Sequence, residues 1–581
     1  MSSLFIRFCG SGGVIHEWRE IIRSVSLYDY LSVAPVVIIL LGILYLGLKI
    51  GPRYSDAVDY QLVAPVKWYQ TRSLDWDGMG AHSWPSLSRV HGFPNTSGIV
   101  AYHHLAFTGN LYAGALKQAS FALMGLVALY SLSRMLGIRR RLAIIVIYFA
   151  LFTPEFLLQF SEGYADLAMA GGLVTSLLFL FLFISSGGYK WLVLCCIGTG
   201  LVGGIKNTGI IFSFSLFLII SIYLIKIKAP MRRIYGMIAL FSAFWLLLAA
   251  PWYLHNVIRY ANPLYPIEVK FFGHQIFKGP FPVNQYTRAF MEKRTDSYLE
   301  AIWITYREDS PGISLAQMFA GLGSGFFILG VPALAISFII ALFKRDKGFM
   351  TVWLSFLTVY LFQTVKWHAR FTLYLAFFSG LCLVWLMQNF RKPGRLVLGL
   401  FLSVCLLFNA AKSITSVASV FQPPDFLFFS HRTGDFSPQQ FDHYPGYYSV
   451  RQYVREHFAE KNNTLYYFPH VGAISLMPKD MKLRMITFPA ENKNQWFRYM
   501  LKENVDYIYD LRPEKFGNFI DEERWLNENS LIFQPVIMTV SSGLHRGRFY
   551  GERIAVERLY RIDKDALIHF LEQDNADRER D

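Results

Sequence analysis

Hydrophobic residues gather in long runs that short polar loops separate over most of the chain. A run of about twenty mostly apolar residues is long enough to cross a bilayer as a helix. The pattern therefore predicts an α-helical polytopic membrane protein with about eleven transmembrane helices. We expect spans near 31–50, 111–137, 142–160, 164–187, 190–205, 208–226, 234–257, 318–343, 349–365, 371–389 and 396–416.

Polar regions divide the chain into three parts. Residues 1–30 are polar and basic, and residues 31–416 hold all the apolar runs together with two long loops, 51–110 and 258–317. Residues 420–581 contain no spanning run and predict a small α/β domain, whose size of about 150 residues is enough for its own core. In this domain we expect strands near 464–468, 505–509, 531–540 and 553–560, and helices near 449–461 and 494–504.

The basic residues predict how the chain is oriented in the membrane. Lys and Arg collect in alternate loops, near 134–141, 190, 226–233, 344–347 and 391–395. Such loops are typically cytoplasmic. This predicts a cytoplasmic N-terminal segment, outward-facing loops 51–110 and 258–317, and an extracytoplasmic C-terminal domain on the inner (plasma) membrane.

Composition supports a membrane protein and explains its charge. Charged residues make up 17% of the chain and hydrophobic residues 53%, whereas soluble domains carry about 25% charged residues. The net charge of +15 follows largely from the basic cytoplasmic loops. We therefore expect membrane lipids, and no nucleic acid, as partners.

The first outward loop holds a segment with helical periodicity, residues 54–68. One stripe of this segment is apolar, and Asp56, Asp59 and Tyr60 lie beside it. The pattern predicts a short amphipathic helix at the membrane interface that presents two carboxylates, with a bend or break at Pro65. A solvated loop whose acids have no role is the alternative.

Four other groups of ionisable or polar residues lie at predicted outer ends of spans. Ionisable groups at span ends are often simple anchors whose charge reaches the interface. Acidic and basic groups gathered on one face instead indicate a polar cavity that opens outward, with carboxylates beside a phosphate-binding group. The groups are Glu162 with Asp166; Lys206 after a glycine pair; His255, Asn256 and Arg259; and His368 with Arg370.

Several kinds of site lack their motifs. The chain has no Walker loop and no dinucleotide-binding glycine turn, and its five cysteines form no disulfide or zinc pattern. His82, His91, His103 and His104 in the first outer loop lack the spacing of a tight metal site. We expect no cofactor, although a divalent metal ion is left open.

Taken in order, the outward motifs resemble those of the polytopic GT-C glycosyltransferases, which include protein O-mannosyltransferases and the aminoarabinose transferase of lipid A. The resemblance covers about residues 30–415. Two features depart from it: Gln61 stands where many relatives have histidine, and the first loop has Asp-Ala where some have an acidic pair, which puts metal dependence in doubt. The matching segments are Asp56–Pro65, Gly163–Ala168, Gly204–Gly209, Pro251–Pro266 and His368–Tyr374.

The resemblance implies a membrane glycosyltransferase with a polyprenyl-phosphate-linked sugar as donor and a hydroxyl of a lipid, glycan or protein as acceptor. Asp56 is then the candidate base, and Asp166 a second carboxylate that orients the acceptor or shares its proton. Lys206, with Arg370 or Arg259 behind it, would hold the donor phosphate, and a single displacement would invert the anomeric carbon. Further substrate-binding candidates are Asp59, Tyr60, Glu162, His255, Asn256 and His368.

Two other functions fit parts of this pattern. A transporter or flippase of lipid-linked sugars also needs outward basic residues, but typically shows internal repeats and interrupted mid-membrane helices, and no repeat is visible here. A ligase or polymerase that moves whole glycans from a lipid carrier uses the same fold, and the sequence does not separate it from single-sugar transfer.

Overall fold

The structure is a computed structural model. It describes residues 27–50, 61–74, 92–160, 162–271, 274–279, 281–282, 298–307, 321–363, 366, 368–390, 394, 399–408, 410–411, 454, 457–458, 463–467, 480–486, 492–513, 525–526, 528–543 and 553–578. Most of the predicted helix at 54–68, with Asp56, Asp59 and Tyr60, therefore lies outside the described residues.

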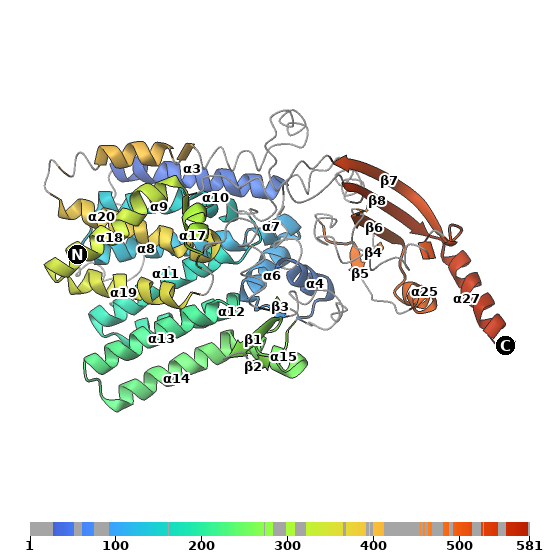
Figure 1. Cartoon of the computed structure of the whole chain (residues 1–581), viewed down its shortest axis with the longest axis horizontal. Coiled ribbons are helices and arrows are strands. Elements are labelled where there is room, and N and C mark those ends of the chain that lie inside the picture. The colour runs from blue at the N-terminus through green and yellow to red at the C-terminus, as the bar shows by residue number, and fades with distance from the viewer. Residues whose placement is uncertain are drawn as a thin grey trace.

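Most of the described chain forms a bundle of helices that run side by side along one direction (Figure 1). This confirms the helical polytopic architecture. The bundle contains α3 (Leu27–Ile50), α7 (Leu111–Ala115), α8 (Lys117–Met135), α9 (Arg140–Leu151), α10 (Pro154–Phe160), α11 (Asp166–Ser186), α12 (Tyr189–Ile205), α13 (Gly209–Lys226), α14 (Met231–Leu248), η3 (Phe326–Gly330), α18 (Val331–Lys344), α19 (Lys347–Phe362) and α20 (Tyr374–Asn389).

The helices agree with the predicted spans in position, but not all of them have the length of a membrane span. Within the described residues, 6 helices are long and apolar enough to cross a membrane, and a bent pair brings the number to 7. Four shorter apolar helices, including Gly399–Phe408, coincide with other predicted spans. Each of the predicted spans thus has a helical counterpart, while the count of eleven stays a prediction.

The span predicted at 142–160 is not one continuous helix. Its two halves, α9 and α10, meet at an angle of 75°. Pro154 begins α10, and proline is favoured at the first position of a helix because its missing N–H has no intrahelical partner there. The break places α10 entirely inside the protein, where all seven of its residues are buried.

Glycines allow the central helices to approach closely. A Cβ atom on Gly125 of α8 would lie 2.6 Å from the Cα atom of Gly171 of α11. Small residues at such crossings are typical of helix packing in membranes. The contact brings α8 close to the start of α11, which carries Asp166.

Several shorter elements lie at the end of the bundle nearest the C-terminal sheet (Figure 1). They are α4 (Val63–Thr71), α6 (Thr96–Thr108), α15 (Ala250–Tyr260) and the strands β1 (Ile267–Phe271), β2 (His274–Phe277) and β3 (Phe281–Pro282). Helix α17 (Tyr298–Arg307) instead contacts η3 of the bundle. The turn between α13 and α14, which holds predicted cytoplasmic charges, lies at the opposite end.

Helix α4 differs from the predicted interfacial helix in two ways. Pro65 does not break it but lies in its first turn, where a missing N–H costs little. Its apolar residues Val63, Val66 and Trp68 are buried within the protein. The helix is therefore held by protein contacts, and its position at the membrane interface stays a prediction.

A mixed five-stranded sheet forms the C-terminal part of the chain, with strand order β5-β4-β6-β8-β7. Strands β5 and β6 pair in parallel with β4, whereas β8 pairs antiparallel with β6 and β7. The four predicted strands are present, and β5 and α27 were not predicted. The elements are β4 (Thr464–Tyr467), β5 (Arg484–Ile486), β6 (Tyr507–Pro513), β7 (Phe533–Gly543), β8 (Arg553–Ile562), α25 (Lys493–Lys502) and α27 (Lys564–Arg578).

The two faces of this sheet are buried against different parts of the chain. Alternate strand residues point to opposite faces. Tyr466, Ile508 and Tyr560 join the hydrophobic cluster of α25 and α27. Their neighbours Leu465, Tyr509 and Leu559 join a cluster that contains Leu62, Val66 and Trp68 at α4. The cluster around α25 and α27 consists only of C-terminal residues and forms a core of their own, whereas α4 belongs to the cluster on the other face.

Candidate active site

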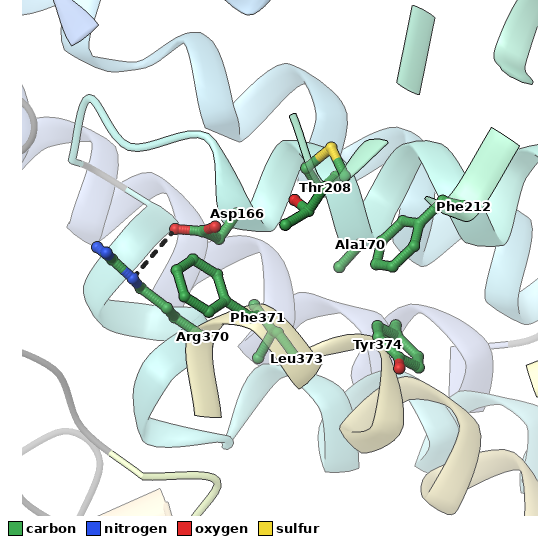
Figure 2. Close-up of a pocket in the computed structure, with 9 residues that line it drawn as sticks. Asp166, Ala170, Thr208, Phe212, Arg370, Phe371, Leu373 and Tyr374 are labelled. Atoms are coloured by element: carbon green, nitrogen blue, oxygen red, sulfur yellow. Dashed lines mark ion pairs between the residues drawn. The ribbon is translucent and has the colours of Figure 1, made fainter. Parts of the chain in front are cut away.

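Three buried charged side chains from distant parts of the chain meet where α11 begins and α12 ends. The Nζ atom of Lys206 lies 2.9 Å from Oδ1 of Asp166, and Nε of Arg370 lies 3.6 Å from Oδ2. Lys206 and Arg370 are each 8% exposed, and Asp166 is 4% exposed. Figure 2 shows Arg370 and Asp166 pointing toward each other across the pocket mouth. We call these three residues the charge cluster.

An aromatic ring is shared by the two cations of the charge cluster. The ammonium of Lys206 lies 4.2 Å and the guanidinium of Arg370 lies 4.8 Å from the ring centroid of Phe371. Aromatic faces attract cations. The ring thus contacts both cations, each of which also lies beside Asp166.

A small pocket opens beside the charge cluster. Asp166, Thr208 and Arg370 supply polar groups, and the remaining wall is apolar or aromatic (Figure 2). Such a combination suits a ligand with one charged group and one apolar part. The apolar wall consists of Met169, Ala170, Phe212, Phe371, Leu373 and Tyr374.

Glycines position Lys206 between α12 and α13. Lys206 itself has an extended backbone directly after α12. A Cβ atom on Gly204 would lie 2.2 Å from Thr96 Oγ1 and 2.5 Å from the carbonyl oxygen of Leu248. The end of α12 therefore fits against α6 and α14 only because this position has no side chain, and the fit directs the lysine toward Asp166.

Two glutamines hold the first turn of α11, where Asp166 lies. The N–H group of Leu167 donates to Oε1 of Gln159 at 2.9 Å, and that of Ala168 donates to Oε1 of Gln118 at 3.0 Å. The first N–H groups of a helix have no intrahelical acceptor. These side chains supply the missing acceptors within the buried interior.

The glutamines are themselves fixed by further hydrogen bonds. The side-chain amide of Gln118 donates to the carbonyl oxygens of Gln159 and Glu162 at 3.2 and 3.4 Å. The amide of Gln159 donates to the carboxylate of Glu155, which is fully buried. A hydrogen-bonded network thus runs from α10 through α8 to the start of α11, and it fixes the backbone that carries Asp166.

A second buried lysine joins the first outer loop to the bundle. Lys117, the first residue of α8, is fully buried, and its Nζ atom donates to Oε1 of Gln61 at 2.9 Å. A buried cation at a helix N-terminus is doubly unfavourable, since burial removes its hydration and the helix dipole is positive there. Such a residue inside a span is by default a functional candidate.

The sequence-predicted residues divide into three groups in the structure. Asp166, Lys206 and Arg370 come together as predicted. Glu162 is buried beside Gln118, and His368 lies two residues before Arg370 with its ring 5.0 Å from that of Phe371. Asp56, Asp59 and Tyr60 lie outside the described residues, so their roles stay predictions.

The third group lies on α15. The amide of Asn256 donates to the carbonyl oxygens of Gly92, Pro263 and Tyr265 at 2.7–3.3 Å, so it holds a turn together. His255 lies against the ring of Tyr260, and Arg259 is exposed. Of the two alternatives for supporting Lys206 at the phosphate, Arg370 therefore has the better geometry.

Sequence reasoning missed Lys117, Glu155, Gln118 and Gln159. Lys117 and Glu155 stand inside predicted apolar spans, and an ionisable residue within a span is itself a usable indication of function. In the described part of the chain, no three His, Cys, Asp or Glu side chains gather where they would hold a metal ion. His103 and His104 belong to α6, whereas His82 and His91 lie outside the described residues.

Comparison with known proteins gives structural neighbours only. No family model matches the sequence, and no curated protein matches it. Two similar solved structures are both of ArnT from Cupriavidus metallidurans. The structure bound to undecaprenyl phosphate has a TM-score of 0.49 and 12% identity, over 90% of this chain and 98% of that chain. The apo structure has the same score and identity, over 91% and 97%. The functional assignment rests on the residues of the site.

Proposed function

We propose that this protein is a membrane glycosyltransferase that moves a sugar from a polyprenyl-phosphate-linked donor to an acceptor hydroxyl on the outer face of the cytoplasmic membrane. The observation that carries the proposal is the charge cluster. Lys206 and Arg370 present two buried cations beside Asp166 and next to a small, largely apolar pocket, a combination that supports binding of a phosphate attached to an apolar chain.

The reaction follows from the charges that develop during transfer. The acceptor oxygen forms a bond to the anomeric carbon while the bond from that carbon to the phosphate oxygen breaks, and the bonding electrons leave with the phosphate. Lys206 and Arg370 would stabilise this negative charge, which is the term that such preorganised groups usually supply. A single displacement inverts the anomeric carbon.

The proton of the acceptor hydroxyl needs a base. In the structure both oxygens of Asp166 face cations, so we assign Asp166 to orienting Lys206 and Arg370. Asp56, which the family resemblance nominates, would take the proton. This division assigns one carboxylate to the phosphate side of the sugar and the other to the acceptor side.

The test uses purified full-length protein with radiolabelled polyprenyl-phosphate sugars and lipid, glycan and protein acceptors. Asp56→Asn keeps the size of the side chain but removes the base, so turnover should fall by about 10²–10⁴-fold while donor binding persists. Lys206→Met should weaken donor binding, and Lys206→Arg should retain part of it because the charge remains. Wild-type turnover by Asp56→Asn at saturating donor would remove the proposed base, and sugar lipid crossing the bilayer without transfer would favour a flippase.

A further inference from the structure

The C-terminal sheet has no role in the chemistry proposed above. It is, however, in contact with helix α4. Helix α4 follows the loop segment that carries Asp56, and the chain reaches α4 within seven residues of that position. The contacts of α4 therefore bear directly on where the first outer loop is held.

The end of α4 is hydrogen-bonded to the C-terminal part of the chain. The side-chain amide of Gln70 donates to the carbonyl oxygens of Met481 and Leu483, at 2.8 Å each. Both N–H groups of one amide are thereby used on two backbone acceptors in the segment before β5. A side chain of another length or without two donors does not reproduce this pair of bonds.

The apolar side of α4 belongs to a hydrophobic cluster that includes residues of α6 and of the C-terminal sheet. Leu62, Val66 and Trp68 share a hydrophobic cluster with Leu465 and Tyr509 of the sheet. Met481 and Leu483, whose carbonyl oxygens bind Gln70, belong to this cluster as well. One surface thus combines an apolar contact with two directed hydrogen bonds, which fix the rotation of α4 about its axis as well as its distance from the sheet.

The other end of α4 is connected to the charge cluster. Gln61 accepts a hydrogen bond from Lys117 of α8. The next residue, Gln118, holds the first turn of α11 at Ala168, two residues from Asp166. Helix α4 is therefore fixed at its start to the helices that carry Asp166 and at its end to the C-terminal sheet.

We propose that the C-terminal α/β part of this protein is a brace that positions α4, and through α4 the catalytic first loop, relative to the charge cluster. Gln70 is in this assignment a positioning residue and touches no substrate. The inference rests on the proposed function for its catalytic readout. Its mechanical part, that the C-terminal sheet restrains α4, holds independently of the reaction.

If the C-terminal part braces α4, weakening this contact should lower kcat without changing the affinity for polyprenyl phosphate. Gln70→Ala in the full-length protein removes both hydrogen bonds that hold the end of α4, so kcat should fall by up to about 10-fold. The affinity for polyprenyl phosphate, which Lys206 and Arg370 would bind, should stay within twofold of wild type. Amide hydrogen exchange in α4 should accelerate, while exchange in the turn between α12 and α13 stays unchanged.

Three further variants complete the experiment. Gln534 lies on β7, at the edge of the sheet opposite β5. Gln534→Ala removes its side-chain hydrogen bond to Asp563 and should change neither kcat nor exchange in α4. Gln70→Glu keeps the length of the side chain but removes both N–H donors, so it should lower kcat as Gln70→Ala does. Lys117→Met releases the start of α4 and should give the same loss of kcat with unchanged binding of polyprenyl phosphate.

The possible results separate the brace from the proposed reaction. Unchanged exchange in α4 of Gln70→Ala overturns the brace, and so does a parallel loss of kcat and phosphate affinity, since that would report general damage to the site. If the wild-type protein shows no sugar transfer, the proposed function fails. The exchange measurements then still decide whether the C-terminal sheet restrains α4.

Discussion

Neutralising Asp166 should destabilise the folded protein, because it removes a buried carboxylate that faces two buried cations. Lys206 and Arg370 lie 2.9 and 3.6 Å from the two carboxylate oxygens and approach the same aromatic ring. Asp166→Asn keeps the shape of the side chain and removes only the charge. Breaking a buried ion pair in this way typically costs about 3–5 kcal/mol, and mutual repulsion of the cations adds to the loss.

A double-mutant cycle measures how much of this loss belongs to the pair. Lys206→Met in the Asp166→Asn background removes one of the two cations that face residue 166. The double variant should therefore be more stable than the sum of the two single effects predicts. For residues in contact, coupling of about 0.5–3 kcal/mol is usual, and burial places this pair at the upper end. Unfolding of the detergent-purified variants by denaturant gives the required free energies.

An exposed ion pair in the same protein provides the control. Lys270 and Glu268 lie 3.0 Å apart, but the lysine side chain is 50% exposed. Exposed pairs typically contribute about 0–1 kcal/mol, so the cycle of Glu268→Gln and Lys270→Met should show little coupling. If the Asp166–Lys206 coupling is no larger than that of the control pair, the charge cluster is not the buried, mutually dependent unit described above.

Other regions of the protein give three further predictions. Gly204→Ala should destabilise the protein by about 1–3 kcal/mol, because the new methyl group meets Thr96 and Leu248; Gly42→Ala on α3, where nothing lies within 4 Å, should not, and equal thermal unfolding midpoints would contradict this. Burial lowers the pKa of His104 from its ordinary value of 6.5, so its contribution to stability is present above that pH and is lost as the pH falls toward the lowered value; His104→Gln should flatten the dependence of the unfolding midpoint on pH in that window. A phosphatase fused after residue 425 should be active and one fused near residue 230 inactive, since the positive-inside rule places them on opposite sides; the reverse pattern would put the charge cluster in the cytoplasm.

The sequence by itself determined the features that depend on local patterns. Apolar runs of sufficient length specify helices wherever they occur, because in lipid each backbone polar group must be satisfied within its own segment. Alternation of apolar residues likewise indicated β4 and β8, and the positions of Asp166, Lys206 and Arg370 at span ends indicated a common cavity. These conclusions need only the spacing of residues along the chain.

Only the tertiary structure decided which distant residues meet. The angle of 75° between α9 and α10 brings Glu155 and Gln159 under the start of α11, and periodicity contains no information on such a bend. In the sequence, Lys117 is a single charged residue within an apolar run. Its hydrogen bond to Gln61 shows that it connects α8 to the segment just before α4.

The C-terminal sheet shows the same limit most clearly. Strand alternation predicts that one face of each strand is buried, but the identity of the covering element is set by contacts across some 400 residues, such as Gln70 with Met481. Hydrophobic burial is non-directional, so an apolar face in the sequence does not name its partner. The packing of the folded chain made α4 a part of that sheet's core.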